Sequence, residues 1–290
     1  MKKVRLDLLV AEAGGFASRE AAKRAIMAGL VKNSKGEVLD KPGQSVPESL
    51  QVQITGPAHQ FVGRGGLKLE RALKQFGVSL DNKVVLDVGA STGGFTDCSL
   101  QHGAALVYAV DVGYGQLAWK LRNDSRVVVR ERTNFRHVAA DEFDPRPEVA
   151  VMDVSFISTR LLIPKLLEVL SEPKQIISLV KPQFEAGKGS VGKGGIVRDP
   201  GIHVEVLQDL LKYAYSEGLE CGGIEYSPIS GGDGNIEYLA LWRMNGKHET
   251  YLDVEMWGQR VREVVIEAWQ TLQSKSVEEI VIRSHYNSES

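Results

Sequence analysis

Residues 84–95 read Val-Val-Leu-Asp-Val-Gly-Ala-Ser-Thr-Gly-Gly-Phe, and this stretch decides the fold class. An apolar run rich in β-branched residues passes through an acidic residue into a glycine-rich turn, and a helical pattern begins at Phe95. This order predicts a buried strand, a tight loop and a helix, which together form the first unit of a doubly wound α/β sheet. Glycines at positions 89, 93 and 94 let the backbone approach a ligand closely, and a helix start supplies unpaired N–H groups. We therefore expect a nucleotide-bearing cofactor at this loop.

The loop also narrows the choice of cofactor. A dinucleotide-binding fingerprint would require glycine at position 91, where this chain has Ser91. The next apolar run, residues 106–110, is followed by Asp111, whose carboxylate suits the ribose hydroxyls of either NAD or S-adenosylmethionine. The loop as a whole resembles the cofactor loop of class I S-adenosylmethionine methyltransferases, especially the ribose 2'-O-methyltransferases. The alternative is that its glycines serve only the packing of helix against sheet.

The composition is that of an ordinary globular protein of one or two domains. The chain has 290 residues, of which 43% are hydrophobic and 25% charged. The chain has no run of about 18 apolar residues, so it contains no predicted membrane span. Its charged first residues do not resemble a signal peptide. Cys98 and Cys221 have neither metal-ligand spacing nor a redox motif around them. These features lead us to expect a cytoplasmic protein.

Positive charge is concentrated at the start of the chain. Residues 1–80 contain 13 Lys+Arg against 7 Asp+Glu, whereas the remainder contains 22 against 30. A basic first quarter on an acidic body suggests that the N-terminal part meets a polyanion. An unevenly charged, solvated surface would show the same distribution.

Residues 1–56 read as a small separate domain. Apolar residues at helical spacing predict a first helix that opens at Arg5, and Ser18 is a candidate N-cap for a second helix over 19–28. The spacing of these segments resembles the α-L RNA-binding fold of ribosomal protein S-four. A helical cap with an exposed basic face is the plainer alternative. The resemblance implies that the RNA backbone is bound by Arg5, Ser18, Arg19, Lys23, Arg24 and Lys32.

Two segments flank the predicted catalytic domain, residues 67–248. The connection 57–66 contains three glycines and Arg64, so it permits a hinge or a close approach to RNA, unless it is a plain surface linker. Residues 249–290 form a C-terminal helical extension with an apolar stripe at helical spacing. We expect that stripe to dock on its own domain, although a membrane-active or partner-binding helix would also carry one.

Four charged residues of the predicted catalytic domain lie at the ends of predicted strands or on the helix before the first strand. Strands alternate with helices from residue 80 onward, and two of these helices are predicted over 158–170 and 203–217. This order is typical of a parallel sheet with crossover helices, and such sheets bind ligands beyond the carboxyl ends of their strands. Asp153 and Lys181 each follow an apolar strand-like run directly. Lys68 lies on the helix before the first strand, and Glu237 lies at the start of the last strand. In this chain order they look like the Lys-Asp-Lys-Glu tetrad of ribose 2'-O-methyltransferases, the alternative being four unrelated surface charges.

The tetrad predicts a division of roles. A ribose hydroxyl is a poor nucleophile until its proton leaves, and a lysine with the ordinary pKa of about 10.4 is protonated at neutral pH. Burial and a second nearby cation lower the pKa of a lysine. We therefore assign Lys181 as the base and Lys68 as the cation that tunes it. Asp153 and Glu237 would orient the lysines, with Asp153 also close to the methyl donor.

Read as a whole, the chain resembles the TlyA, or hemolysin-A-like, family of two-domain rRNA methyltransferases over about residues 4–245. The resemblance rests on residues 63–69, 87–96, 110–117, 180–187, 191–199 and 234–237. It implies a class I methyltransferase (Rossmann-like) α/β fold, with a seven-stranded sheet and a small N-terminal α-L RNA-binding domain. It also implies S-adenosylmethionine as cofactor and methylation of the ribose 2'-hydroxyl of cytidine in small- or large-subunit ribosomal RNA.

The same resemblance implies where the cofactor binds. The contacts with the cofactor would come from the first glycine-rich loop, from the ends of the next two strands and from Asp153 of the tetrad. These residues are Asp87, Gly89, Ala90, Ser91, Thr92, Gly93, Gly94, Phe95, Asp111, Val112, Asn134 and Asp153.

Two other functional classes stay open on the sequence alone. The first is a hemolysin or membrane-active protein, against which the absence of a predicted span argues. The second is an RNA-binding protein with a vestigial catalytic domain, against which the complete tetrad argues. The six histidines show no metal-ligand spacing, so we expect no metal. As partner we expect ribosomal RNA within ribosomal subunits, bound by a monomer.

Overall fold

The computed structural model of the chain describes residues 3–13, 19–27, 29–54, 61–231, 234–244, 253–275 and 280. The chain divides between Gly66 and Leu67 into two compact units, each with its own interior.

The first unit combines helices with very short strands in the part of it that is described. Strand β1 pairs antiparallel with β3, and β2 pairs antiparallel with β4. Leu6, Val10 and Ile26 are fully buried between α1 and α2 and form the centre of a small apolar core. Arg5 lies in β1, so the first helix begins one residue later than the sequence predicts. The elements are β1 (Lys3–Arg5), α1 (Leu6–Ala13), α2 (Arg19–Met27), β2 (Val31–Asn33), β3 (Ser45–Pro47) and β4 (Val52–Ile54).

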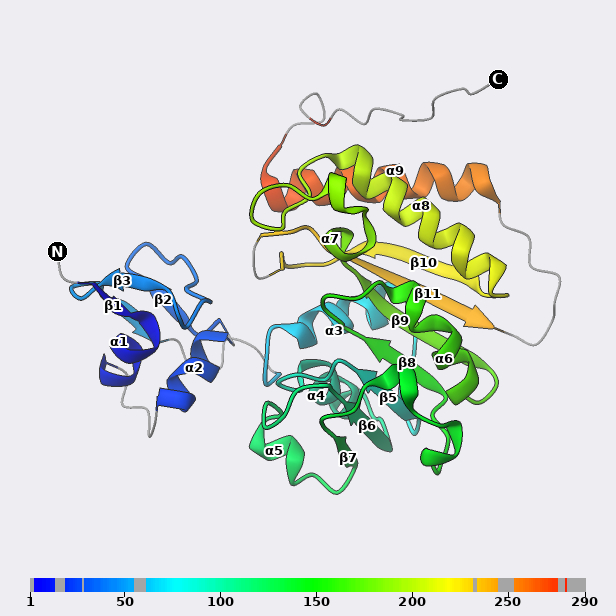
Figure 1. Cartoon of the computed structure of the whole chain (residues 1–290), viewed down its shortest axis with the longest axis horizontal. Coiled ribbons are helices and arrows are strands. Elements are labelled where there is room, and N and C mark those ends of the chain that lie inside the picture. Colours follow the sequence, from blue (N-terminus) through cyan, green and yellow to red (C-terminus); the bar gives the residue numbers. More distant parts are fainter. Residues whose placement is uncertain are drawn as a thin grey trace. The chain divides into compact units, whose positions relative to one another are not determined.

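The second unit is built around one seven-stranded sheet, with helices packed on its two faces (Figure 1). The strand order is β10-β11-β9-β8-β5-β6-β7, and only β11 runs against the others. The elements are α3 (Gly65–Phe76), β5 (Val84–Val88), α4 (Gly94–Gln101), β6 (Leu106–Val110), α5 (Trp119–Arg122), β7 (Val127–Arg130), β8 (Val149–Met152), α6 (Ile163–Val169), β9 (Lys174–Val180), α7 (Pro182–Glu185), α8 (Pro200–Ser216), β10 (Glu220–Tyr226), β11 (Tyr238–Met244) and α9 (Val254–Gln273).

The strand order creates one place where a ligand can bind. From β5 the chain first adds β6 and β7 on one side and then crosses back to add β8 and β9 on the other. The loops after β5 and β8 therefore leave in opposite directions, which opens a crevice at the carboxyl ends of these neighbouring strands.

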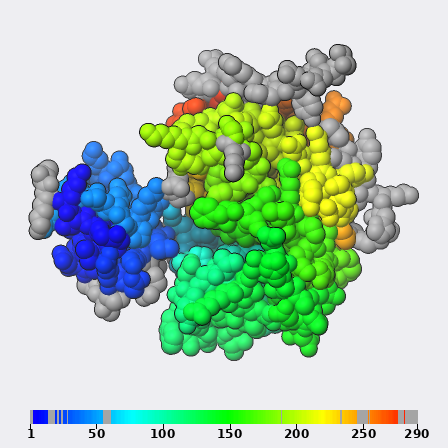
Figure 2. Space-filling view, viewed as in Figure 1, coloured from blue at the N-terminus to red at the C-terminus, as the bar shows by residue number. Residues whose placement is uncertain are grey.

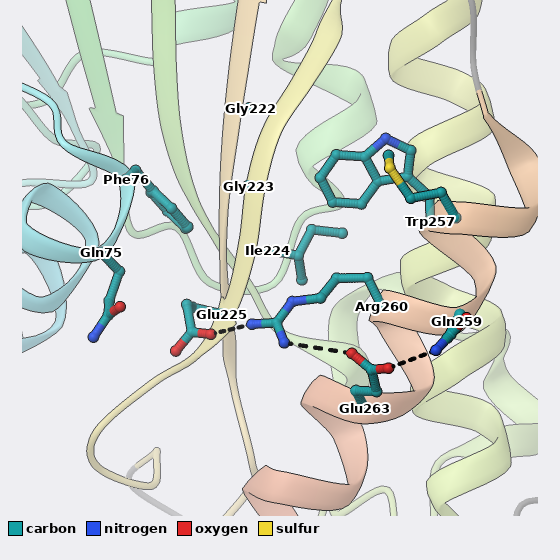
Figure 3. Close-up of a pocket in the computed structure, with 11 residues that line it drawn as sticks. Gln75, Phe76, Gly222, Gly223, Ile224, Glu225, Trp257, Gln259, Arg260 and Glu263 are labelled. Carbon is teal, nitrogen blue, oxygen red and sulfur yellow. Dashed lines mark hydrogen bonds and ion pairs between the residues drawn. The ribbon is translucent and has the colours of Figure 1, made fainter.

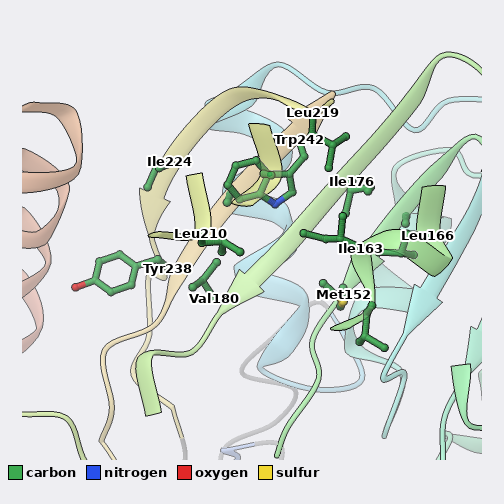
Figure 4. Packing of buried hydrophobic residues seen from close by; sticks show 14 of the residues in the cluster. Met152, Ile163, Leu166, Ile176, Val180, Leu210, Leu219, Ile224, Tyr238 and Trp242 are labelled. Atoms are coloured by element: carbon green, nitrogen blue, oxygen red, sulfur yellow. The ribbon is translucent and has the colours of Figure 1, made fainter. Parts of the chain in front are cut away.

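Alternate strand residues form a large apolar core under α6, α8 and α9 (Figure 4). Met152, Ile176 and Trp242 from three neighbouring strands are essentially inaccessible to solvent in this layer. The Trp242 indole N–H donates to Ser178 Oγ at 2.9 Å, which satisfies the one polar group of that ring. The outer side of α8 (yellow) is at the molecular surface in Figure 2.

Two helices differ from the sequence prediction, and each begins at or next to a proline. The predicted helix 158–170 is a short 3₁₀ turn, Thr159–Leu161, followed by α6 from Ile163, because Pro164 has no N–H for a helical bond to Arg160 and fits only in the first turn of a helix. Helix α8 begins at Pro200 instead of His203, since Asp199 caps it by accepting from the Gly201 N–H at 2.8 Å.

The apolar stripe of the C-terminal extension docks on the second unit. Helix α9 lies beside α8 and against β10 (Figure 1). Its residues Val261, Val264, Val265 and Ala268 are fully buried in the same core as the sheet. Within the described ranges, no helix has the length and apolar character that crossing a membrane would need.

The burial of α9 predicts a large stability effect for one substitution and a small one for another. Trp269 is 5% exposed and its ring meets that of His203 at a centroid distance of 5.5 Å. We expect Trp269→Ala to lower the free energy of unfolding by about 3–5 kcal/mol, because it leaves a cavity in the core. The control Met256→Ala, on the same helix but 51% exposed, should change it by less than about 0.5 kcal/mol. If chemical denaturation showed equal, small decreases in the free energy of unfolding for both variants, the docking of α9 would be contradicted.

Candidate active site

Four charged side chains meet at the carboxyl edge of the sheet. Lys68 comes from the first turn of α3, Asp153 directly follows β8, and Lys181 directly follows β9. Glu237 directly precedes β11, and because β11 is antiparallel to β9, with Tyr238 opposite Val180, the start of β11 lies at the end of β9. The four predicted catalytic residues are therefore brought together by elements that lie far apart in the sequence.

The four residues form a chain of alternating charge. Lys68 Nζ lies 2.6 Å from Glu237 Oε2 and 3.8 Å from Asp153 Oδ2. Lys181 Nζ lies 2.6 Å from Asp153 Oδ1. The lysine side chains are each 10% exposed and Glu237 4%, whereas Asp153 is 22% exposed. Asp153 is thus the shared, most accessible member, held between two ammonium groups.

The charge state of Asp153 follows from this position. Burial by itself would raise the pKa of the Asp153 carboxyl, but the charges and hydrogen bonds of Lys68 and Lys181 outweigh burial and lower that pKa below its ordinary value. Asp153 is therefore a carboxylate at neutral pH that lies between the two lysines, and the orienting role predicted for it from the tetrad stays a prediction.

Exposed aromatic rings lie beside the charges and were missed by sequence reasoning. Lys181 Nζ donates to Ser155 Oγ at 2.9 Å, and the next residue, Phe156, is 91% exposed with a positive φ of 65°. Its ring lies 5.2 Å from that of Phe184, on the turn after Lys181. A strained, fully exposed phenylalanine at such a site suggests a binding role. The available signal was a large apolar residue three positions after a strand-end acid.

A second exposed ring lies after β6. Tyr114 is 67% exposed, and the Arg132 guanidinium lies 4.1 Å from its ring centroid. The Arg132 N–H donates to the Gly113 carbonyl at 2.9 Å, which joins the loops that follow β6 and β7. These two loops thus present a cation stacked on an aromatic ring at the carboxyl edge.

The loop that carries the aromatic residue after β8 is fastened to α7. The Glu185 carboxylate accepts from Ser158 Oγ at 2.6 Å, and from the N–H and hydroxyl of Thr159 at 2.7 and 2.8 Å. Sequence reasoning did not find this contact, because Glu185 and Thr159 are 26 residues apart. The contact fixes the segments bearing Asp153 and Lys181 against each other.

The glycine-rich loop after β5 packs directly on Asp153. Gly89 has φ +87°, and a Cβ added there would lie 2.5 Å from the Asp153 carbonyl oxygen, so only glycine fits. Asp111 accepts from the Ser91 N–H at 2.8 Å and from the Gly113 N–H at 2.6 Å. These bonds hold the Asp111 carboxylate at the crevice with lone pairs left to accept from ribose hydroxyls.

Asp87 is the most perturbed acid of the cofactor loop. It is fully buried, and its Oδ2 accepts from the Thr96 hydroxyl at 2.6 Å. Its Oδ1, also buried, has no hydrogen-bond partner in the described part of the chain. Burial raises the pKa of this carboxyl to about 7, and the charges of Asp153 and Asp111 add to the increase. An orphaned carboxylate oxygen behind the loop fits a site that receives a cationic or hydrogen-bonding ligand.

The other predicted cofactor residues divide by exposure. Ala90, Gly93, Gly94 and Phe95 are buried at the start of α4, Thr92 is half-buried, and Ser91 is exposed with a φ of 47°. Val112 is 72% exposed at the end of β6. Asn134 is exposed after β7, where its Oδ1 accepts from the Arg136 N–H at 3.2 Å. The exposed members surround the carboxyl ends of β5, β6 and β7.

Four of the predicted RNA-binding residues of the first unit have ionic partners. Arg5 and Arg19 both bond to Asp7, and Lys23 Nζ lies 2.6 Å from Glu20 Oε1. Ser18 lies outside the described residues, and so does the side chain of Arg24. Lys32, in β2, is half-buried. Arg64 pairs with Asp40 at 3.0 Å and is 24% exposed, so within this unit it fastens the end of the linker.

One cleft of the second unit lies apart from these charges (Figure 3). It has a volume of about 510 Å³ and lies between the end of α3, the edge strand β10 and α9. Glu225, at its floor, accepts from Arg71 at 2.8 Å and from Arg260 at 2.6 Å, which ties α3 and α9 to the strand. None of the four tetrad residues lines it. In the described part of the chain, no cluster of three or more His, Cys, Asp or Glu side chains could hold a metal ion.

Comparison with known proteins identifies the family. The family model described as FtsJ-like methyltransferase matches residues 61–244, which contain the whole sheet and all four charged residues. The chain belongs to the FtsJ-like methyltransferase family. Its class I methyltransferase fold and its dependence on S-adenosylmethionine, both predicted from the sequence, are thereby confirmed.

Individual relatives of this FtsJ-like methyltransferase cover most of both chains. It is 51% identical over 280 residues to "Putative rRNA methyltransferase YqxC" of Bacillus subtilis, covering 96% of this chain and 98% of the relative. It is 42% identical over 242 residues to "16S/23S rRNA (cytidine-2'-O)-methyltransferase TlyA" of Mycobacterium tuberculosis, covering 83% and 90%. A solved structure of a "putative hemolysin" from Streptococcus thermophilus matches with a TM-score of 0.74 and 44% identity, covering 94% and 98%. These names agree with the predicted TlyA or hemolysin-A-like family.

The raised pKa of Asp87 predicts a pH dependence of stability. Between about pH 4 and pH 7 the folded FtsJ-like methyltransferase keeps a proton on Asp87 that the unfolded chain releases, so this group's contribution to the free energy of unfolding falls as pH rises and is constant above pH 7. Asp87→Asn removes the ionisable group, and with it the decrease in stability as pH rises. We expect the variant to gain stability over the wild type between pH 4 and pH 7.5, by at most about 4 kcal/mol. A difference in urea denaturation that is the same at both pH values would contradict the assignment.

Proposed function

We propose that this enzyme transfers a methyl group from S-adenosylmethionine to the ribose 2'-hydroxyl of cytidine in ribosomal RNA of the small subunit, the large subunit or both. The observation that carries the proposal is the buried chain of Lys68, Asp153, Lys181 and Glu237 at the carboxyl edge of the sheet. The name of the Mycobacterium tuberculosis relative supports the choice of nucleotide and RNA.

The residues of the crevice divide into a donor side and an acceptor side. When bound, S-adenosylmethionine supplies an electrophilic methyl group. Asp111 would hold the ribose of the cofactor, with Asp87, the glycine-rich loop, Val112 and Asn134 around the rest of it. The close packing of Gly89 on Asp153 sets that loop directly beside the tetrad. On the acceptor side the reacting group is a hydroxyl, and one residue must take its proton.

Lys181 is better suited to that task than Lys68. Lys68 lies near two carboxylates, those of Glu237 and Asp153, which favour its charged form. Lys181 contacts the Asp153 carboxylate and the neutral Ser155 hydroxyl. With one carboxylate neighbour instead of two, Lys181 gives up its own proton more readily, and in its neutral amine form it receives the proton of the ribose hydroxyl through Nζ. Lys68 remains a cation that orients Asp153 and attracts the RNA. Glu237 holds Lys68 in place.

The surface around Lys181 suits a nucleotide taken out of its stack. Phe156, with Phe184 behind it, offers a ring beside the base, and Tyr114 with Arg132 offers a second stacking surface after β6. Base–aromatic stacking is the commonest way in which proteins hold single-stranded RNA. These exposed rings favour an RNA acceptor over a small molecule enclosed in a cavity.

The remaining parts of the chain receive roles that agree with this proposal. Residues 1–56 serve as the RNA-binding domain, 57–66 as the linker, 67–248 as the catalytic domain and 249–290 as a helical extension. The first unit supplies affinity through arginine and lysine contacts with phosphates, and the second unit carries out the chemistry. We propose that the enzyme acts as a monomer in the cytoplasm, with ribosomal subunits as its partner.

The role of Lys181 is tested by tritiated methyl transfer to separated small and large subunits that lack the modification. We expect Lys181→Ala to lower the rate by about 10²–10⁴-fold, because the hydroxyl loses its base. The label should survive base hydrolysis as a 2'-O-methyl dinucleotide. Lys174→Ala, at the opposite end of β9, is the matched control and should retain full activity.

Each result of this assay has a clear meaning. Label on neither subunit, despite measured binding of S-adenosylmethionine, would reject ribosomal RNA as the substrate. Label that is lost in alkali would reject the ribose hydroxyl as the acceptor. Full activity of the Lys181 variant would reject this residue as the base.

The stacking role of the ring after β8 predicts a change in KM. We expect Phe156→Ala to raise the KM for RNA about tenfold with little change in kcat, since stacking contributes about 1–3 kcal/mol per base. Phe156→Tyr should restore the KM because it keeps the ring. Leu161→Ala, which removes another exposed apolar side chain nearby, is the control. A loss of kcat at unchanged KM would assign the residue to the chemical step instead.

A further inference from the structure

The first unit contains a buried carboxylate that the proposed reaction does not use. Asp7 lies in the first turn of α1 and is fully buried. Its Oδ1 accepts from Arg5 Nε at 3.1 Å, and its Oδ2 accepts from Arg5 Nη2 at 2.9 Å. The same Oδ2 also accepts from Arg19 Nη2 at 2.9 Å. One carboxylate thus binds the guanidinium groups of β1 and α2 together.

The geometry places the two arginines side by side. Both Nη2 atoms lie 2.9 Å from the same oxygen, so they are separated by no more than twice that distance. The Arg5 side chain is 50% exposed and the Arg19 side chain 44% exposed, whereas Asp7 is 0% exposed. The carboxylate therefore lies inside the unit, and the two cations that it holds reach the solvent.

Charge explains why a buried acid is needed there. Two guanidinium groups this close repel each other unless an anion lies between them. The hydrogen bonds from Arg5, together with the bond and charge of Arg19, hold the pKa of Asp7 at about 2 in spite of its burial. Asp7 is thus ionised throughout the physiological range, and the three groups together retain a net positive charge.

We propose that Asp7 is a positioning residue that holds Arg5 and Arg19 as one binding site for a backbone phosphate of RNA. This inference rests on the proposed function and deepens it, because it names the residue that holds this pair of arginines in place for a single phosphate. Asp7 itself would not touch the RNA.

A phosphate is the ligand that fits two fixed guanidinium groups. Arginine presents a planar fork of five donors, of which Arg5 uses its Nε and Nη2 on Asp7. Holding both side chains before RNA arrives reduces the entropy lost on binding. The pair is therefore prepared for bidentate contact with phosphate oxygens.

The proposal makes a prediction opposite to that of simple electrostatics. Removing a negative charge from an RNA-binding surface normally tightens binding to a polyanion. Glu20→Gln removes such a charge from the exposed pair with Lys23 on α2, and we expect unchanged or tighter binding. Asp7→Asn also removes one negative charge, yet we expect it to weaken binding about tenfold, because the two arginines are no longer held together.

The experiment measures binding of the full-length protein to radiolabelled ribosomal RNA fragments, as a function of salt, for the wild type and both variants. Hydrogen exchange over residues 6–13 and 19–27 reports whether the first unit stays folded. Methyl transfer at saturating RNA is measured in parallel, and kcat should be unchanged in Asp7→Asn, because the second unit is intact.

A second variant tests the proposed phosphate site if Asp7→Asn unfolds the first unit. Arg5→Lys combined with Arg19→Lys keeps both charges and Asp7 but loses the forked geometry. We expect about tenfold weaker binding with an unchanged dependence of log Kd on log salt concentration. The proposal would be overturned if the double lysine variant, or a folded Asp7→Asn variant, bound RNA as tightly as the wild type. Failure of the wild type to bind ribosomal RNA would instead reject the proposed function.

Discussion

The pairing of Asp153 with two ammonium groups is the interaction on which the rest of the site depends. Four charged side chains withdrawn from water would repel or remain unpaired unless their signs alternated, and Asp153 is the member that both lysines share. This arrangement requires β8 and β9 to be parallel neighbours, and it requires β11 to run in the opposite direction so that Glu237 reaches the same edge. The topology of the sheet is therefore a condition for the chemistry.

The same acid connects the two halves of the reaction. Gly89 packs on the Asp153 carbonyl so closely that no side chain fits, and the Asp153 carboxylate holds Lys181. The glycine-rich loop and Lys181, the proposed base, are thereby fixed to one residue. Glu185 adds a second connection by binding the loop after β8 to the turn after β9. An in-line methyl transfer requires this kind of fixed alignment between donor and acceptor.

Sequence reasoning predicted the elements better than their ends. The strands of the central sheet, and with them Asp153 and Lys181, follow from apolar runs that stop at charged residues, a signal confined to a few neighbouring positions. Lys68 and Glu237 were added by resemblance to the methyltransferase tetrad. The helix over 158–170 was wrong because Pro164 interrupts it, and the start of α8 was wrong because the cap at Asp199 was not recognised. The place of Phe156, three residues after a strand-end acid, was a weak local signal, whereas the bond between Glu185 and Thr159 had none, since it depends on how two loops pack.

The sequence by itself determined the fold class, the cofactor and the identity of the four charged residues, because each rests on residue types at short spacings or on a motif. Only the tertiary structure decided which groups touch. It paired Lys68 with Glu237 across 169 residues, gave Asp87 a buried and partnerless oxygen, and brought Arg5 and Arg19 onto Asp7. Distances, burial and charge compensation arise when distant segments pack against each other, and no periodicity along the chain encodes them.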